Sequence, residues 1–335
     1  IARECLAQFA KLPKTGKPNE SFEWTILSAI VLVTPAHHAA SSDIRVVALG
    51  TGTKCLPGDE LSPRGDRVHD SHAEVLARRA FVRYLYEQIE QALLVEGGQP
   101  KESIFERQTV DGGGCGKFVL KNGHSFHFFT THSPCGDASI YKREEDALLP
   151  AKRARRTDEA YRTAVGMTGG KLLDPEAHGD LMAQTIGAVR TKPGRGVRTA
   201  SVSCSDKLAR WNVLGVQGGL LMMLLGRPIY LDGVVVCDGT DHSVVALERA
   251  IWGRFERWKE PALREPFERH HRPVVIAADG GGKFQPSPCG IVWCDVKERP
   301  HEVEVAGRRH GVTKRKLATP AARLQISKIE LFNRF

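Results

Sequence analysis

The sequence predicts an α/β fold, a three-layer sandwich in which helices flank one central mixed β-sheet. Apolar β-branched segments alternate with segments of helical periodicity along all 335 residues, which favours a sheet covered by helices. The 41% of hydrophobic residues can fill a sizeable core. No repeat of solenoid type interrupts this pattern. We therefore expect a single domain spanning residues 1–335.

The first elements are two strands and a long helix. Residues 24–34 and 44–49 are β-branched runs bounded by turn residues, which predicts neighbouring strands. From 71 to 94 apolar side chains recur near helical spacing, with Asp70 or Ser71 available as the helix cap. This is the clearest helix in the sequence.

The middle of the chain combines a second strand-to-helix unit with an insertion. Residues 124–131 predict a buried strand that runs into Pro134, a residue favoured at helix starts. Residues 142–197 are charged and contain Gly and Pro, so we expect an inserted loop. Its basic run at 152–156 is typical of a solvated linker, with a nuclear signal as the alternative.

The last third repeats the alternation. We expect a strand at 199–203 followed by a helix at 206–225, and a further helix at 243–258. Apolar runs predict strands at 229–237, 273–278 and 290–296. The chain starts at Ile1 and ends inside an apolar helix-like run at 326–335, so we expect a fragment lacking both native ends.

Charge and cysteine content indicate the class of partner and the compartment. A net charge of +9 and a pI near 9.2 favour a polyanion such as RNA, with a solvated basic surface as the alternative. Eight cysteines are too few for a disulfide scaffold, and no signal peptide opens the chain. No apolar run approaches the roughly 20 residues that a membrane helix needs. We expect a soluble intracellular protein, in nucleus or cytoplasm, with no membrane association.

Two motifs carry metal chemistry. His72-Ala73-Glu74 opens the clearest helix, and Cys135 follows Pro134 at the next predicted helix start. Zinc binds imidazole nitrogen and thiolate sulfur, and a catalytic zinc keeps three protein ligands and one open position. The positive end of a helix dipole also favours a thiolate. His72 and Cys135 are therefore candidate ligands.

The third ligand is displaced from its usual place. An H-x-E motif followed by P-C-x-x-C is typical of zinc-dependent deaminases, in which the Glu stays off the metal. Here Ala138 stands where the second cysteine would be, and the next cysteine downstream is Cys204, which also joins a predicted strand to a helix. We interpret Cys204 as the third ligand. The competing Cys289 precedes a strand pattern, so it is interpreted as a packing thiol. The same interpretation covers the remaining cysteines: Cys5, Cys55, Cys115, Cys237 and Cys294.

Three segments, 69–79, 133–139 and 203–217, resemble the adenosine deaminases that act on RNA. Within that family the chain looks most like the tRNA-specific branch, which converts the adenosine 3′ of the anticodon of alanine tRNA to inosine. The similarity to this branch rests on residues 16–18, 23–25, 50–55, 192–196 and 326–332. The resemblance covers nearly the whole chain outside the inserted loop.

The resemblance implies a deaminase-type fold and an enzyme that deaminates adenosine hydrolytically in tRNA. It implies Zn²⁺ held at helix N-termini by His72, Cys135 and Cys204, with Glu74 as the proton shuttle. Thr53 and Lys54 would contact the substrate nucleotide. The partner that the resemblance implies is tRNA, specifically alanine tRNA, and no obligate protein partner is indicated.

The family also buries an inositol hexakisphosphate beneath its active site. The matching positions here are Arg78, Arg79, Lys207, Arg210, Trp211, Gln217 and Lys328. Buried cations need an anion to offset their desolvation, and the alternative is ion pairing with a local acid such as Asp206. The chain stops soon after Lys328, so the further C-terminal positions of the family pattern are absent from it.

Three other functions stay open at this point. A double-stranded-RNA adenosine deaminase shares the chemistry, but the chain contains no duplex-binding module and no counterpart of a base-flipping loop. A loop adenosine also costs less to unstack than a paired one. A non-catalytic RNA-binding pseudo-deaminase would have no use for Glu74. A free-nucleoside cytidine deaminase is disfavoured by the displaced third cysteine and the net charge of +9.

Overall fold

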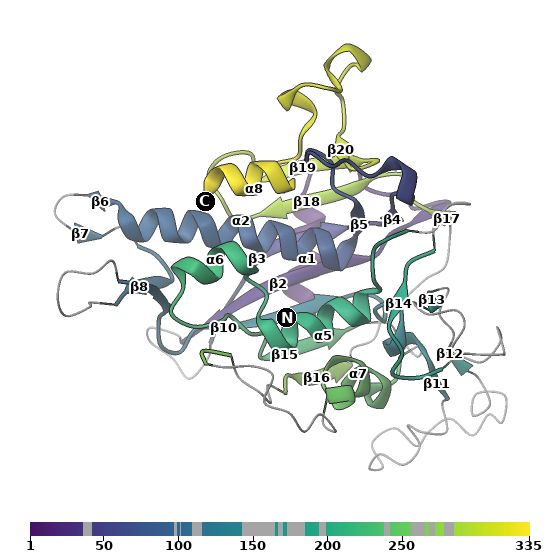
Figure 1. Ribbon diagram of the computed structural model, residues 1–335, viewed down its shortest axis with the longest axis horizontal. Coiled ribbons are helices and arrows are strands. Elements are labelled where there is room, and N and C mark those ends of the chain that lie inside the picture. The colour runs from purple at the N-terminus through teal and green to yellow at the C-terminus, as the bar shows by residue number, and fades with distance from the viewer. Residues whose placement is uncertain are drawn as a thin grey trace.

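A mixed eight-stranded sheet forms the centre of the molecule (Figure 1). The computed structural model describes residues 1–35, 42–96, 99–100, 102–108, 116–142, 165–166, 170–172, 185–193, 199–237, 242–255, 265–267, 272–277 and 285–335. In spatial order the strands are β16 (Val274–Ala277), β15 (Gly233–Val236), β10 (Ser125–Thr130), β2 (Leu27–Thr34), β3 (Asp43–Thr51), β18 (Gly290–Cys294), β19 (His301–Val305) and β20 (Arg308–Arg309). Strands β10, β15 and β16 run parallel to one another, and the other neighbouring pairs are antiparallel.

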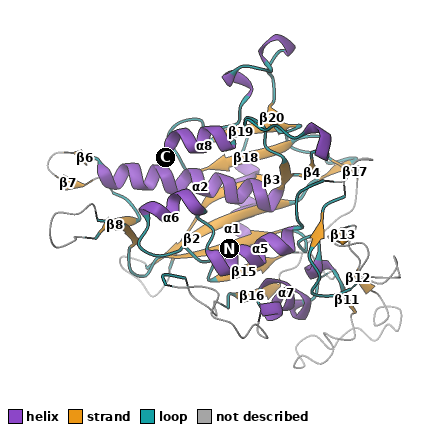
Figure 2. Ribbon diagram, in the orientation of Figure 1, coloured by secondary structure: helices purple, strands orange, loops and turns teal. Residues whose placement is uncertain are grey.

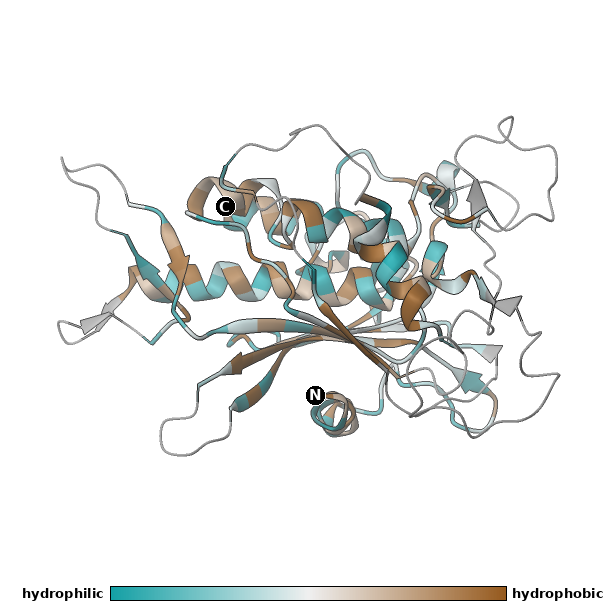
Figure 3. Ribbon diagram, turned by 90° about the horizontal axis from the view of Figure 1, so that it is seen from below, coloured by the Kyte–Doolittle hydropathy of each residue, from teal (hydrophilic) through white to brown (hydrophobic). Residues whose placement is uncertain are grey.

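Helices cover both faces of this sheet (Figures 2 and 3). Their bounds are α1 (Ala2–Lys11), α2 (Ala73–Leu93), α5 (Cys204–Leu214), α6 (Gly219–Leu224), α7 (Val244–Ile251) and α8 (Lys328–Arg334). Alternate residues of β2 face opposite layers, as the two-residue period of a strand requires. Ala29 and Val31 pack in the cluster that includes Cys5 of α1, whereas Ile30 and Leu32 pack in the cluster that includes α2.

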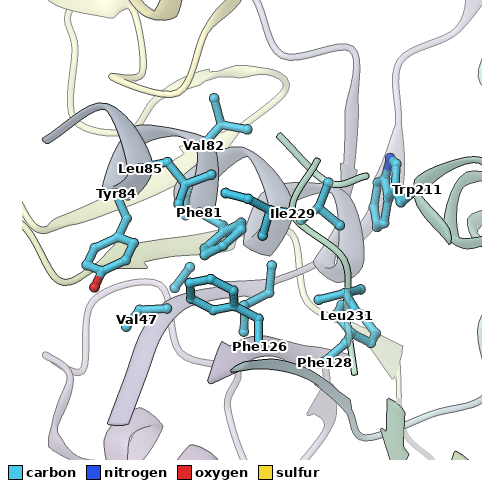
Figure 4. Packing of buried hydrophobic residues seen from close by; sticks show 14 of the residues in the cluster. Val47, Phe81, Val82, Tyr84, Leu85, Phe126, Phe128, Trp211, Ile229 and Leu231 are labelled. Carbon is cyan, nitrogen blue, oxygen red and sulfur yellow. The ribbon is translucent and has the colours of Figure 1, made fainter. Parts of the chain in front are cut away.

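Helix α2 packs against the central sheet through large buried side chains. Phe81 packs edge-on against Phe126 of β10, with ring centroids 4.8 Å apart, and aliphatic side chains close the space around this pair (Figure 4). Burying such large aromatic side chains contributes about 1.5–3 kcal/mol each to the free energy of folding. Helix α2 is thereby anchored to the central sheet.

Small strand pairs complete the fold at its periphery. They are β4 (Thr53–Cys55) with β5 (Asp70–His72), β8 (Phe105–Arg107) with β9 (Phe118–Leu120), β1 (Glu23–Trp24) with β17 (Gln285–Pro286), β6 (Val95–Glu96) with β7 (Gln99–Pro100), β11 (Tyr141–Lys142) with β12 (Val165–Gly166) and β13 (Lys171–Leu172) with β14 (Arg190–Thr191). Within the described ranges no helix is long and apolar enough to cross a membrane.

The expected mixed α/β architecture, a large central sheet flanked by helices, is confirmed. The predicted helix at 71–94 is α2, but its cap differs from the expectation: His72 is the N-cap residue and makes no side-chain capping bond. Asp70 instead accepts the His72 N–H at 3.1 Å. Of the predicted insertion at 142–197, most residues, including the basic run 152–156, lie outside the described residues.

Three predicted elements were wrong in detail. The helix expected at 206–225 is two helices, because Gly215 and Gly218 adopt φ values of 78° and 84° that end one helix and precede the next. After Pro134 there is a single 3₁₀ turn, Asp137–Ser139, rather than an α-helix. The strand expected at 199–203 is reduced to one bridge, between Thr191 of β14 and Val202.

Helix α7 is also shorter than the predicted 243–258. It ends at Ile251 and is followed by the 3₁₀ turn Gly253–Phe255, while 256–258 lie outside the described residues.

Candidate metal centre

Three predicted ligands meet at the N-termini of α2 and α5. The ligand atoms of His72, Cys135 and Cys204 all lie within 4.8 Å of one another. His72 Nδ1 is 3.7 Å from the Cys204 sulfur and 4.0 Å from the Cys135 sulfur. His72 ends β5, Cys135 lies in the turn after β10, and Cys204 is the first residue of α5. The fold therefore brings together three side chains that are far apart in the sequence.

Gly136 lets the Cys135 turn lie directly on the start of α5. Its φ is 103°, and a Cβ atom there would lie 2.2 Å from Ser203 Oγ, so only glycine fits. Ser205 then completes the contact: its N–H donates to the Cys135 carbonyl at 3.0 Å and its hydroxyl to the Pro134 carbonyl at 3.1 Å.

The pKa values of the two cysteine thiols are shifted in opposite directions. The Cys204 N–H donates to Cys135 Sγ at 3.3 Å. Hydrogen bonding from Cys204 lowers the pKa of Cys135, whereas burial raises the pKa of the Cys204 thiol. Lys192 donates to Cys204 Sγ at 3.0 Å. A site with one imidazole, two sulfurs and a neighbouring ammonium suits a divalent metal that binds thiolates, such as zinc.

Glu74 lies beside this group without joining it. The side chain is only 1% exposed, and its Oε2 has no hydrogen-bond partner in the described structure. A buried carboxylate oxygen is expensive to leave unpaired, so its position indicates a group that the protein alone does not supply. The residues fit a zinc ion with three protein ligands, a fourth open position and Glu74 as a nearby proton acceptor.

The two predicted substrate residues lie on the strand next to the ligand strand. In the β4–β5 pair Thr53 is opposite His72 and Lys54 is opposite Ser71. Thr53 Oγ1 is buried and, within the described residues, has no hydrogen-bond partner. Ala73 N–H donates to the Gly52 carbonyl at 3.0 Å, which ties this strand to the start of α2. Thr53 and Lys54 are thus positioned at the edge of the metal centre.

Arginines following β15 hold both cysteine segments. Arg249 of α7 forms an ion pair with the fully buried Asp137 at 3.1 Å and donates to the Asp137 and Ile140 carbonyls at 2.9 and 2.6 Å. Arg254 pairs with Asp206 at 2.6 Å, and Asp206 in turn accepts the Ser203 hydroxyl at 2.6 Å. These contacts fix the turn that follows Cys135 and the first turn of α5, which begins at Cys204.

Sequence reasoning missed two functional candidates, Lys192 and Asp70. Lys192 is 1% exposed and bridges Cys204 to Asp70, whose carboxylate oxygens it contacts at 2.9 and 2.8 Å. Lys207 also contacts Asp70. Although burial raises the pKa of Asp70, Lys192 and Lys207 together hold that pKa well below its usual range. The sequence pattern indicates Asp70 only as a helix cap, and no spacing rule connects a lysine with a cysteine 12 positions later.

A basic cavity of about 820 Å³ lies next to the metal centre, and Asp70 and Lys207 are among its lining residues. Asp70 is the acidic residue among those that line it. All seven positions matched to the inositol phosphate site line this cavity: Arg78, Arg79, Lys207, Arg210, Trp211, Gln217 and Lys328. The alternative, ion pairing with a local acid, holds for Lys207, although its partner is Asp70. Asp206 pairs with Arg254 instead.

Two of the cavity cations, Arg78 and Arg79, are strongly desolvated. Burial lowers the pKa of both Arg78 and Arg79 to about 10, with further lowering by their cationic neighbours. Each Nε donates to a main-chain carbonyl, Arg78 to Val216 at 2.8 Å and Arg79 to Ile326 at 2.7 Å. Arg79 Nη2 is buried with no partner in the described structure. Among the lining residues, Asp70 is the one carboxylate that offsets the charge of these cations, and buried cations need such an offset.

The other cysteines have different surroundings. Cys5, Cys237 and Cys294 are buried in the two apolar clusters, and burial raises the pKa of Cys5 and Cys294 to about 12. Cys289 directly precedes β18 and does not belong to the group with His72. Cys55 is half-buried in β4, and Cys115 lies outside the described residues.

Comparison with known proteins gives consistent matches. The sequence model for the adenosine-deaminase (editase) domain matches residues 48–335. The Drosophila melanogaster protein named tRNA-specific adenosine deaminase 1 is 42% identical over 100% of this chain and 80% of its own length. The Mus musculus protein of the same name is 33% identical over 100% and 86%. The Drosophila melanogaster double-stranded RNA-specific editase Adar is 33% identical over 75% of this chain and 35% of its own length.

Proposed function

The chain belongs to the adenosine-deaminase (editase) family, and from this premise we propose that it converts adenosine to inosine in tRNA by zinc-dependent hydrolysis. The observation that carries the proposal is the group of His72, Cys135 and Cys204 with the buried, unpaired carboxylate of Glu74 beside it. In this proposal the fold is the deaminase-type three-layer sandwich, one domain with its zinc at the N-termini of α2 and α5.

Each residue has a defined role in the proposed reaction. His72, Cys135 and Cys204 would hold Zn²⁺, which supplies the Lewis acidity that makes water a nucleophile near neutral pH. Glu74 would take one proton from the attacking water and pass it to the ring nitrogen as the water oxygen adds to C6 of adenine. It would then carry the remaining hydroxyl proton to the amino group, which departs as ammonia and leaves inosine. The burial of Glu74 keeps bulk water away from these transfers.

The proposed substrate is an unpaired adenosine in tRNA, next to the anticodon of alanine tRNA. The relatives named for tRNA match this chain over its full length, which supports tRNA as the class of substrate. Thr53 and Lys54, on the strand beside His72, are proposed to contact the nucleotide. A hydroxyl and an ammonium there can bind sugar and phosphate oxygens.

We further propose that the basic cavity holds inositol hexakisphosphate. A polyanion there would pair with Arg78, Arg79, Lys207, Arg210 and Lys328, beside Trp211 and Gln217. A chain of ion pairs and hydrogen bonds, through Lys207, Asp70 and Lys192, would connect this polyanion with Cys204. The unpaired Arg79 Nη2 supports a ligand in this position.

The proposed function is tested by incubating the purified protein with total tRNA and mapping inosine at nucleotide resolution. We expect inosine 3′ of the anticodon of alanine tRNA, loss of product after zinc removal, and recovery when zinc is restored. A matched transcript with guanosine at that position serves as the control. No inosine in any tRNA from the zinc-loaded protein would refute the proposal.

A double-stranded-RNA deaminase is the second candidate. It is supported by the 33% identity to the Drosophila melanogaster duplex editase. The same assay with a perfectly paired RNA decides between the two, because the tRNA-specific function predicts much faster reaction of the tRNA loop. Faster reaction of the duplex would replace the proposed substrate while leaving the chemistry unchanged.

A further inference from the structure

A positively charged loop protrudes from the molecule at some distance from the metal centre. Residues 306–323, named here the basic loop, contain six Lys or Arg residues, one His and no acidic residue. They include β20 and follow β19, and the loop extends away from the sheet at the top of Figure 1. The function proposed above makes no use of these residues.

Internal hydrogen bonds fold the basic loop into a defined shape. It contains two 3₁₀ turns, Lys314–Lys316 and Pro320–Ala322. Arg308 Nη1 donates to the Leu317 carbonyl at 2.6 Å, and Ala322 N–H donates to the Thr319 carbonyl at 3.1 Å. The loop therefore presents its charges from a preorganised backbone rather than from a disordered tail.

The cations at the tip are free to bind a ligand. Lys314, Arg315 and Lys316 are all exposed. Among the described residues, no carboxylate forms a salt bridge with any of these three side chains. Three adjacent, unpaired cations repel one another, which is a cost that a polyanionic partner would relieve.

The base of the basic loop is tied to the segment that joins the substrate strand to the ligand strand. Val68 N–H donates to the Gly307 carbonyl at 2.9 Å, and Arg67 Nη2 donates to the Ala306 carbonyl at 2.9 Å. A Cβ atom on Gly307 would lie 2.3 Å from the Val68 carbonyl oxygen, so the two segments are in close contact. Residues 56–69, which include Val68, connect β4 with β5. The loop is thus fixed relative to Thr53, Lys54 and His72.

We propose that the basic loop binds phosphates of the substrate RNA outside the reacting nucleotide. This inference rests on the proposed function, since it assumes an RNA much larger than the catalytic pocket. RNA fits better than a membrane, because Leu317, at 37% exposed, is the one large apolar side chain of the loop among the exposed ones. RNA also fits better than a protein partner, because a stable protein interface needs an apolar centre that the tip lacks.

The decisive variant is K314Q/R315Q/K316Q. A matched control, R3Q/K11Q/K14Q, removes the same number of positive charges from exposed residues in and next to α1. This helix lies on the face of the sheet opposite α2. The dissociation constant for full-length tRNA is measured at several salt concentrations, with turnover at saturating tRNA and thermal melting alongside.

We expect the loop variant to bind tRNA on the order of 10²-fold more weakly near 0.1 M salt, because each of the three lost phosphate contacts removes about 0.7–0.9 from the salt slope. Its slope should fall by about 2, while melting and turnover at saturating tRNA stay unchanged. The control should keep the wild-type slope. The single variant R315Q should lower the slope by about 0.7–0.9.

Two results would overturn the inference. An unchanged slope in the loop variant would mean that these cations face an acidic protein or a membrane instead, and an equal loss in loop variant and control would reduce the effect to net charge. Because binding is titrated directly, failure of the wild-type protein to make inosine would refute the proposed function without deciding the role of the loop.

Discussion

Glu74 is distinguished from the metal ligands by its surroundings as well as by its chemistry. Glu74 lies two positions after His72, in the first turn of α2, and its buried Oε2 has no hydrogen-bond partner among the described residues. We expect Glu74→Gln to keep its zinc and to lose at least about 10²-fold in deamination, because the amide cannot carry the proton. Elemental analysis and inosine formation measure the two effects. Glu90→Gln, a change at an exposed position on the same helix, is the control.

Near-normal turnover of the Glu74→Gln protein would remove Glu74 from the reaction. Loss of zinc from it would instead make Glu74 a metal ligand.

The choice of Cys204 over Cys289 as third ligand is a second test at the level of single residues. Cys204 belongs to the group with His72 and Cys135, and Cys289 does not. A catalytic zinc needs all three protein ligands to hold it tightly. We therefore expect Cys204→Ala to lose most of its zinc and Cys289→Ala to keep it, as measured by elemental analysis after dialysis. The reverse pattern would assign the third position to Cys289.

Short motifs predicted the metal centre because their chemistry is local. His72 and Glu74 share one tripeptide, and Cys135 follows Pro134. Lys192 could not be found in the same way. Its contact with Cys204 is made by folding of the segment that contains β14 onto α5 and has no fixed spacing in the sequence.

At the scale of elements, the periodicity of apolar residues predicted the bounds of the longest helix. It failed where glycines end a helix. The apolar repeat of α2 gave its bounds to within two residues at its start and one at its end. The helix expected at 206–225 is divided because Gly215 and Gly218 adopt φ values of 78° and 84°, which end one helix before the next begins. The spacing of apolar residues does not indicate which glycines leave the helical conformation.

Helix α7 supports the metal centre without contributing a ligand. Arg249 binds Asp137 and two carbonyls of the turn after Cys135. Removing its charge leaves the fully buried Asp137 without this partner, a loss that typically costs about 3–5 kcal/mol. We expect Arg249→Met to release zinc to a chelator several-fold faster than wild type. The exposed Arg227→Met protein is the control, and equal release rates in both would limit Arg249 to a role outside the metal centre.

At the scale of the whole molecule, three separated helices deliver cations to one cavity. Arg79 comes from α2, Lys207 and Arg210 from α5, and Lys328 begins α8. Sequence reasoning could name these positions only through a family resemblance, because no local pattern indicates that α2, α5 and α8 converge. The convergence follows from packing of all three beside one face of the sheet (Figure 1).

This arrangement predicts that the cavity contributes to folding. Replacing Arg79, Lys207 or Arg210 by Met should lower the free energy of unfolding by about 3–5 kcal/mol if each cation is paired with a buried polyanion. Because a domain is stable by only about 5–15 kcal/mol, such variants should melt at clearly lower temperatures. Thermal melts with and without added inositol hexakisphosphate measure the effect, with the exposed Arg64→Met protein as the control.

The alternative for this cavity is that the same cations bind RNA directly. Exposed phosphate contacts contribute little to stability, so melting would then hardly change while tRNA affinity and its salt slope fall. Lower melting temperatures at all three positions, raised in wild type by the added polyanion, would identify the cavity as part of the folded core. Unchanged melting with weaker tRNA binding at all three would assign the cavity to the substrate, and the link from Lys207 through Asp70 and Lys192 to Cys204 would then connect the metal centre to bound RNA.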